Sequence, residues 1–152
     1  ESDISGINAH KYIDKHIEEV LNLELVDVEL IKKAGFKIAV DGVSSTGGIA
    51  IPQLLKALGV DEVVELYCEP TGDFPHNPEP LPENLKEISK TVVDQKCDLG
   101  IVVDPDVDRL AFVMENGEMF GEEYTLVAAA DYIVENKPGN TVSNLSSTRA
   151  LR

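Results

Sequence analysis

The chain has 152 residues, and its 28 acidic and 13 basic side chains give it a formal net charge of -15 at pH 7. This acidic excess disfavours nucleic acid and anionic membrane surfaces as partners, because both require basic patches. No apolar run approaches the roughly 20 residues that span a bilayer, and the two cysteines show no pairing pattern, so we expect a soluble, cytoplasmic protein.

Helical and strand-like patterns alternate along the first three quarters of the chain. In chain order, the predicted elements are a helix at 9–23, a short helix at 28–34, a strand at 36–41, a helix at 49–59, a strand at 62–67, a helix at 83–95, and strands at 97–103 and 109–114.

Local signals support several of these bounds. Asp27 is a predicted N-cap and Gly35 a predicted stop for the short helix. Pro52 suits the first turn of the helix at 49–59, where no backbone hydrogen bond is lost. Residues 69–82 are rich in proline, which predicts a long loop, and we call this segment the Pro-rich loop.

The alternation of strands and helices predicts an α/β fold. We expect a three-layer α/β/α domain with a mostly parallel sheet and with helices on both of its faces. The turn ENGE at 115–118 marks a change of organisation, and a helix at 123–137 and a strand at 141–146 are predicted after it. We therefore expect one domain over 1–115 and the truncated beginning of a second, similar unit over 116–152.

Three aspartates stand at every second position after the strand at 97–103. Because alternate residues of extended backbone point the same way, Asp104, Asp106 and Asp108 can converge at the carboxyl end of that strand. Carboxylate oxygens suit Mg²⁺, which would remove the repulsion among the three charges. Arg109 adds a planar donor fork suited to a phosphate oxygen. We call residues 104–109 the acidic loop.

Two other interpretations of the acidic loop remain open. It can be a solvated turn, which is the usual fate of Asp-rich loops and which Pro105 favours. It can also be the nucleophilic Asp-x-Asp of haloacid-dehalogenase-like phosphatases, although Asp108 stands where those proteins carry Thr or Val.

The segment DPDVDRLAF resembles the metal-binding loop of the α-D-phosphohexomutases, the phosphoglucomutase and phosphomannomutase family. The resemblance extends through VDGVSSTGG, LLKALGV, FPHNPEPLPENL and CDLGIVVD, in the order and spacing of that family. Residues 10–115 look like its second domain, and the chain from Glu122 onward looks like the start of its third. Pro105 and Val107 replace the small residues that are usual in the loop.

The resemblance implies an intramolecular phosphotransferase that moves a phosphoryl group between O1 and O6 of a hexose phosphate. The enzyme would carry the group on a phosphoserine and pass through a hexose bisphosphate. It implies that Asp104, Asp106 and Asp108 bind Mg²⁺, and that Asp108 and Arg109 lie against the phosphoserine or substrate phosphate. The remaining domains of the same protein would be partners of this one.

The nucleophile that the family uses is missing from this chain. That family carries its serine in a loop of its first domain, directly before a His-Asn-Pro sequence, so the phosphoserine would lie outside this chain. The His76-Asn77-Pro78 of this chain follows Pro75, which has no hydroxyl. We therefore expect the chain alone to be inactive. The rival function is a stand-alone, non-catalytic module that binds phosphosugars.

The loop GVSSTGG at 42–48 has two interpretations. Amides at the start of the following helix can bind a phosphate. Alternatively, the glycines serve a tight turn between strand and helix, since the loop lacks the patterns of dinucleotide and P-loop sites.

Overall fold

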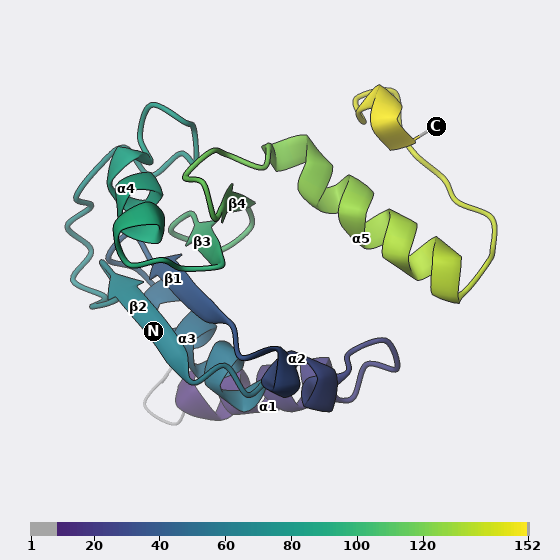
Figure 1. Cartoon of the computed structure of the whole chain (residues 1–152), viewed down its shortest axis with the longest axis horizontal. Helices are drawn as coiled ribbons and strands as arrows, with labels where there is room; N and C mark the ends of the chain where they lie inside the picture. Colours follow the sequence, from purple (N-terminus) through teal and green to yellow (C-terminus); the bar gives the residue numbers. More distant parts are fainter. Residues whose placement is uncertain (1–8, 152) are drawn as a thin grey trace, which may run out of the picture.

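The structure, a computed structural model, describes residues 9–151 (Figure 1). Within these residues, no helix combines the length and the apolar character needed to cross a membrane. The elements along the chain are α1 (Ala9–Leu21), α2 (Val28–Ala34), β1 (Lys37–Asp41), α3 (Gly47–Ala57), β2 (Glu62–Leu66), α4 (Lys86–Asp94), β3 (Leu99–Val103), β4 (Leu110–Met114), α5 (Glu122–Asn136) and the 3₁₀ turn η1 (Arg149–Leu151).

The strands form one sheet in the order β2-β1-β3-β4. Strand β1 is parallel to both β2 and β3, and β4 returns antiparallel to β3 at the edge. Helix α4 packs on β1, β3 and β4, whereas α3 packs on β1 and β2 with α1 outside it. The predicted three-layer α/β fold with a mostly parallel sheet is confirmed.

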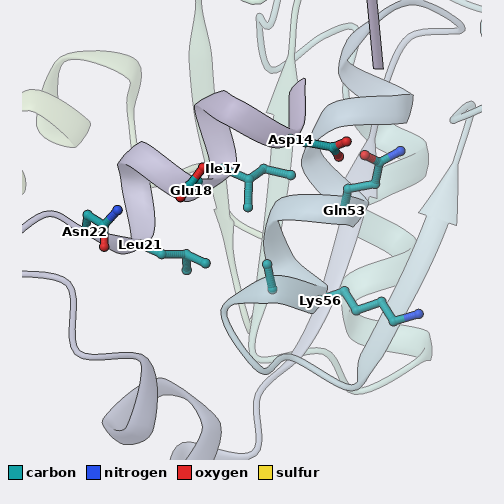
Figure 2. A pocket seen from close by; sticks show the side chains of 8 residues that line it. Asp14, Ile17, Glu18, Leu21, Asn22, Gln53 and Lys56 are labelled. Carbon is teal, nitrogen blue, oxygen red and sulfur yellow. The ribbon is translucent and has the colours of Figure 1, made fainter. Parts of the chain in front are cut away.

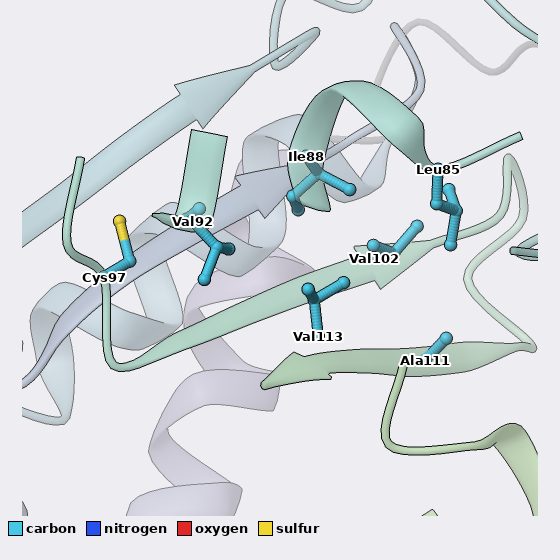
Figure 3. Packing of buried hydrophobic residues seen from close by; sticks show 8 residues of the cluster. Leu85, Ile88, Val92, Cys97, Val102, Ala111 and Val113 are labelled. Carbon is cyan, nitrogen blue, oxygen red and sulfur yellow. The ribbon is translucent and has the colours of Figure 1, made fainter. Parts of the chain in front are cut away.

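One core lies between α4 and the sheet (Figure 3). Ile88 and Val92 stand one helical turn apart on α4 and reach Val102 and Val113 of the two neighbouring strands, and all four are fully buried or nearly so. The spacing of four residues places both α4 side chains on the same face of the helix, toward the sheet.

A second core lies between the sheet and α3. Ile38 and Val40 of β1 belong to this core with Leu55 of α3, whereas Ala39, between them in sequence, belongs to the first. Successive residues of a strand point to opposite faces of the sheet. Because both faces of β1 are buried, its residues are apolar in a continuous run and do not alternate with polar ones.

Helix α3 begins earlier than the sequence indicated. Its first residue is Gly47 rather than Ile49, so the prediction that Pro52 occupies the first turn was wrong, and Pro52 lies inside the helix. The reason is close packing: a Cβ added to Gly48 would lie 2.3 Å from the Cys68 carbonyl oxygen. The glycines permit this approach and do not interrupt the helix.

The predicted strand at 141–146 was also wrong. That segment is irregular, and the side chains of Val142 and Leu145 are 99% and 98% exposed. A strand needs a neighbour for its backbone groups and its apolar side chains, and the described part of the chain offers none there. The preceding helix α5, which Figure 1 shows running away from the sheet, exposes about half of Leu126 and Ile133.

Candidate metal centre

The acidic loop lies at the carboxyl edge of the sheet, directly after β3. Asp104 is 2% exposed, because it continues a buried strand, whereas Asp106 and Asp108 are exposed. One carboxylate oxygen from each of the three lies within 4.8 Å of those of the other two. The structure thus brings together the three aspartates that the alternating pattern singled out.

Arg109 holds the buried member of the group in place. Its backbone N–H donates to Oδ1 of Asp104 at 3.0 Å, and its Nε lies 3.2 Å from Oδ2 of the same carboxylate. The backbone N–H of Val107 donates to the carbonyl oxygen of Asp104 at 3.1 Å, which closes the loop as a turn. Both oxygens of Asp104 are therefore oriented before any ligand arrives.

The three carboxylates differ in their affinity for a proton. Burial by itself would raise the pKa of Asp104. The hydrogen bonds from the Arg109 N–H and from Asp108 lower this pKa, as does the charge of the guanidinium. Together they outweigh burial, and the pKa of Asp104 lies below its ordinary value. The pKa of Asp108 is raised, first by its hydrogen bond with Asp104 and then by the charges of Asp106 and Asp104. Asp108 therefore holds a proton more readily than Asp104 does.

The donor set fits a hard divalent cation. Three carboxylate oxygens within 4.8 Å of one another supply negative charge that Arg109 only partly offsets, as the raised pKa of Asp108 indicates. Oxygen ligands with water or phosphate completing the shell are typical of Mg²⁺. The residues of the acidic loop could hold this ion.

Arg109 also links the acidic loop to the Pro-rich loop. Its Nη1 lies 3.7 Å from Oε1 of Glu79, and its side chain is 45% exposed. The guanidinium thus stands beside the three aspartates with nearly half of its side-chain surface in solvent, where its planar fork can receive an anion.

The structure supports the packing interpretation of the loop at 42–48, and the binding of a phosphate by this loop stays a prediction. The N–H groups of Gly48 and Ile49 donate to the carbonyl oxygens of Ser45 and Thr46, and Gly47 and Gly48 are buried. Sequence reasoning missed the role of the hydroxyls, since both Ser45 and Thr46 donate to the carbonyl oxygen of Pro105 in the acidic loop.

A second buried carboxylate at this edge was also missed. Asp41 ends β1 with 1% exposure, accepts a hydrogen bond from the Val43 N–H and pairs with His76 of the Pro-rich loop. Burial raises the pKa of Asp41 above its ordinary value, against the lowering effects of the Val43 N–H and His76. The signal available in the sequence was an aspartate that ends an apolar strand directly before a glycine.

One hollow of the described part of the chain lies away from the acidic loop. It is an open groove of about 550 Å³ between α1 and the C-terminal half of α3, where Asp14, Glu18 and Lys56 stand among apolar side chains (Figure 2). The acidic loop lies instead beside the N-terminal end of α3, so this groove takes no part in the metal centre.

Comparisons with known proteins agree with the fold. Residues 11–117 match the sequence model of the family described as "Phosphoglucomutase/phosphomannomutase, alpha/beta/alpha domain II". A phosphoglucomutase/phosphomannomutase of Thermococcus kodakarensis is 35% identical over 152 residues, covering 99% of this chain and 33% of that protein. A phosphomannomutase/phosphoglucomutase of Pseudomonas aeruginosa is 37% identical over 153 residues, covering 97% of this chain and 32% of that protein. The chain thus spans about a third of the length of these relatives.

Solved structures show the same arrangement. A crystal structure of a phosphoglucomutase/phosphomannomutase family protein from Burkholderia thailandensis superposes with a TM-score of 0.70 at 31% identity, covering 84% of this chain and 27% of that one. A structure from Thermus thermophilus has a TM-score of 0.79 at 21% identity, covering 95% of this chain and 33% of that one, and supports the fold alone.

Proposed function

The chain belongs to the phosphoglucomutase/phosphomannomutase family, and on that premise we propose that it is the metal-binding middle part of a phosphohexomutase. The whole enzyme would transfer a phosphoryl group between O1 and O6 of a hexose phosphate, through a hexose bisphosphate. The observation that carries this proposal is the cluster of three carboxylates at the sheet edge, with Arg109 beside it.

Each residue of the acidic loop has a role in this proposal. Asp104, Asp106 and Asp108 would hold Mg²⁺, which when bound supplies positive charge to the oxygens of the transferring phosphoryl group. Asp104 is oriented by the hydrogen bond that it accepts from the Arg109 N–H and by its ion pair with the Arg109 guanidinium, so the site needs little rearrangement. Arg109, with Asp108 next to it, would lie against the phosphate of the phosphoserine or substrate and bind an oxygen through its donor fork. Phosphoryl transfer depends mainly on such positioning and charge neutralisation.

The phosphoserine itself would come from outside this chain. Pro75 stands before His76-Asn77, and His76 is engaged with the buried Asp41, so this segment supplies no nucleophile. We further propose that residues 1–115 form the second domain of the enzyme and that 116–152 begin its third. The apolar side chains of α5 are exposed, as are those of Val142 and Leu145. Their exposure supports the proposal that another domain of the enzyme packs against this part of the chain.

Thermal unfolding across a Mg²⁺ titration, at constant ionic strength, tests the metal role. Binding to the folded state stabilises by mass action, and a Mg²⁺ concentration ten times the dissociation constant adds about 1.4 kcal/mol, or roughly 4 °C. We expect a millimolar dissociation constant for the wild-type chain, because three carboxylates form only part of an octahedral shell. Asp106→Asn removes the negative charge of one ligand and should lose most of the response.

The matched control is Asp73→Asn, which removes the same charge from an exposed position of the Pro-rich loop. It should respond to Mg²⁺ as the wild type does. Equal responses of the wild type and Asp106→Asn would exclude Asp106 as a ligand and refute the proposed centre. The rival function is a non-catalytic module that binds phosphosugars, and it predicts that the whole protein lacks mutase turnover. The cytoplasmic location stays a prediction.

A further inference from the structure

Two hydroxyl groups hold the backbone of the acidic loop. Oγ of Ser45 and Oγ1 of Thr46 both donate to the carbonyl oxygen of Pro105, at 2.7 and 3.0 Å. A carbonyl oxygen has two lone pairs, so this one is fully engaged by the two donors. It belongs to the peptide unit that joins Pro105 to Asp106, between the first two aspartates of the metal centre.

The two loops meet because of the strands that precede them. β1 and β3 are parallel neighbours, so the loops that follow them leave the sheet at the same edge. The start of α3 then lies directly on the end of β3, where a Cβ added to Gly47 would be 2.3 Å from Cγ2 of Val103. Only glycine permits this approach, and it brings Ser45 and Thr46 within reach of the next turn of chain.

The acidic loop needs such support. Its three carboxylates lie within 4.8 Å of one another and repel one another, which favours a more open loop when no cation is present. The hydroxyls are uncharged and act on a backbone carbonyl, so they hold the loop without occupying any carboxylate oxygen. The support that they give therefore does not compete with a cation for its ligands.

Val107 shows that the loop shape is imposed by its surroundings. Its φ of 61° is in the left-handed region, which a β-branched residue rarely adopts. Its side chain lines a hollow between α1 and α3 together with Ile13, Ile51 and Leu54. A strained conformation persists when neighbouring structure fixes it from several sides.

From these contacts we infer that Ser45 and Thr46 are positioning residues for the metal centre, acting through the carbonyl oxygen of Pro105. This inference rests on the metal role proposed for the acidic loop. The two residues do not touch the cation; they fix the peptide unit that sets the direction of the Asp106 side chain relative to Asp104.

Mn²⁺ binding to the 152-residue chain, followed by electron paramagnetic resonance of the free ion, tests the inference. The variant S45A/T46V lacks both donors and should bind Mn²⁺ about tenfold more weakly, as is typical when an outer hydrogen bond of a metal site is removed. S45A/T46S restores one hydroxyl and should recover part of the loss. S44A is the matched control, because the hydrogen bonds described for Ser44 run through its backbone, and its affinity should be unchanged.

Circular dichroism and unfolding in EDTA establish that each variant is folded without metal. If S45A/T46V does not fold, the single variants S45A and T46V, which each keep one donor, should still show a loss of about threefold. Wild-type affinity in the folded double variant, or an equal loss in S44A, would overturn the inference while leaving the metal centre intact. Absence of Mn²⁺ binding by the wild-type chain would instead refute the proposed centre, and the inference with it.

Discussion

Nε2 of His76 lies 3.0 Å from Oδ2 of Asp41. The His76 side chain is 17% exposed, and the Asp41 side chain is 1% exposed. The other ring nitrogen, Nδ1, lies 2.8 Å from the carbonyl oxygen of Asn77. The ring of Tyr67 packs edge-on against the imidazole at 5.8 Å between centroids. This contact fastens the Pro-rich loop to the end of β1, next to the acidic loop.

Replacing His76 by alanine should destabilise the domain. The change leaves the buried Asp41 carboxylate without its side-chain partner, and we expect a loss of about 2–3 kcal/mol in the free energy of unfolding. Urea unfolding measures it. His16→Ala, at an exposed position of α1, should change stability by less than about 0.5 kcal/mol. If His76→Ala lowered the free energy of unfolding by no more than His16→Ala does, the pair of His76 and Asp41 would contribute nothing to stability.

The pH dependence of stability should report Asp41. Burial, opposed by the Val43 N–H and His76, leaves the pKa of Asp41 above its ordinary value of 3.8, so the folded state binds this proton more tightly than the unfolded state. Its contribution to stability is present below pH 3.8 and is lost as the pH rises through the raised folded pKa. Asp41→Asn removes this dependence.

Urea unfolding of the wild type and Asp41→Asn at several pH values between about 4 and 7.5 provides the comparison. The stability of the variant relative to the wild type should rise with pH across this window. A difference that is constant, or that falls as the pH rises, would contradict the assignment of a raised pKa to Asp41.

The substitution Gly47→Ala should separate the two loops at the sheet edge. Its added Cβ would lie 2.3 Å from Cγ2 of Val103, so α3 or β3 must shift, at about 1–3 kcal/mol. Gly139→Ala is the matched control, since the nearest atom to its added Cβ is the Lys137 carbonyl oxygen at 4.0 Å. Thermal unfolding should show a lower midpoint for the first variant only, and equal midpoints would argue against the close approach.

The 152-residue chain alone should not interconvert hexose 1-phosphates and 6-phosphates. The His76-Asn77-Pro78 of this chain follows Pro75, which has no hydroxyl, and Mg²⁺ with a bisphosphate activator cannot replace the phosphoserine that we propose lies outside the chain. A coupled assay on glucose 1-phosphate and mannose 1-phosphate checks this, with an intact family member as positive control. Activity that Asp106→Asn abolishes would contradict the prediction, whereas a trace that the variant retains is a contaminant.

Much of the fold follows from local patterns. The apolar residues of β1 and β3, the N-cap at Asp27 and the left-handed Gly35 define their elements without help from distant residues. The alternation of Asp104, Asp106 and Asp108 after a buried strand was likewise enough to predict that they converge. Each of these signals lies within a few residues of the feature it predicts.

The errors and omissions depend on distant neighbours. Gly47 and Gly48 look like helix breakers until Val103 and Cys68 are seen to lie against them. The pairing of Asp41 with His76 spans 35 residues, and the bond from Ser45 to Pro105 spans 60. Residues 141–146 have a strand-like pattern, but no partner strand lies beside them in the described part of the chain.

Helix α5 is expected to unfold locally at a lower free-energy cost than the sheet. It contacts β4 and η1, and its Tyr132 hydroxyl donates to the Leu25 carbonyl oxygen at 3.3 Å, but Leu126 and Ile133 remain half exposed. A helix of 15 residues with so little tertiary packing is marginal by itself. Its amide hydrogens would therefore exchange with solvent through local opening, whereas those of β1 and β3 would exchange only when the whole sheet unfolds.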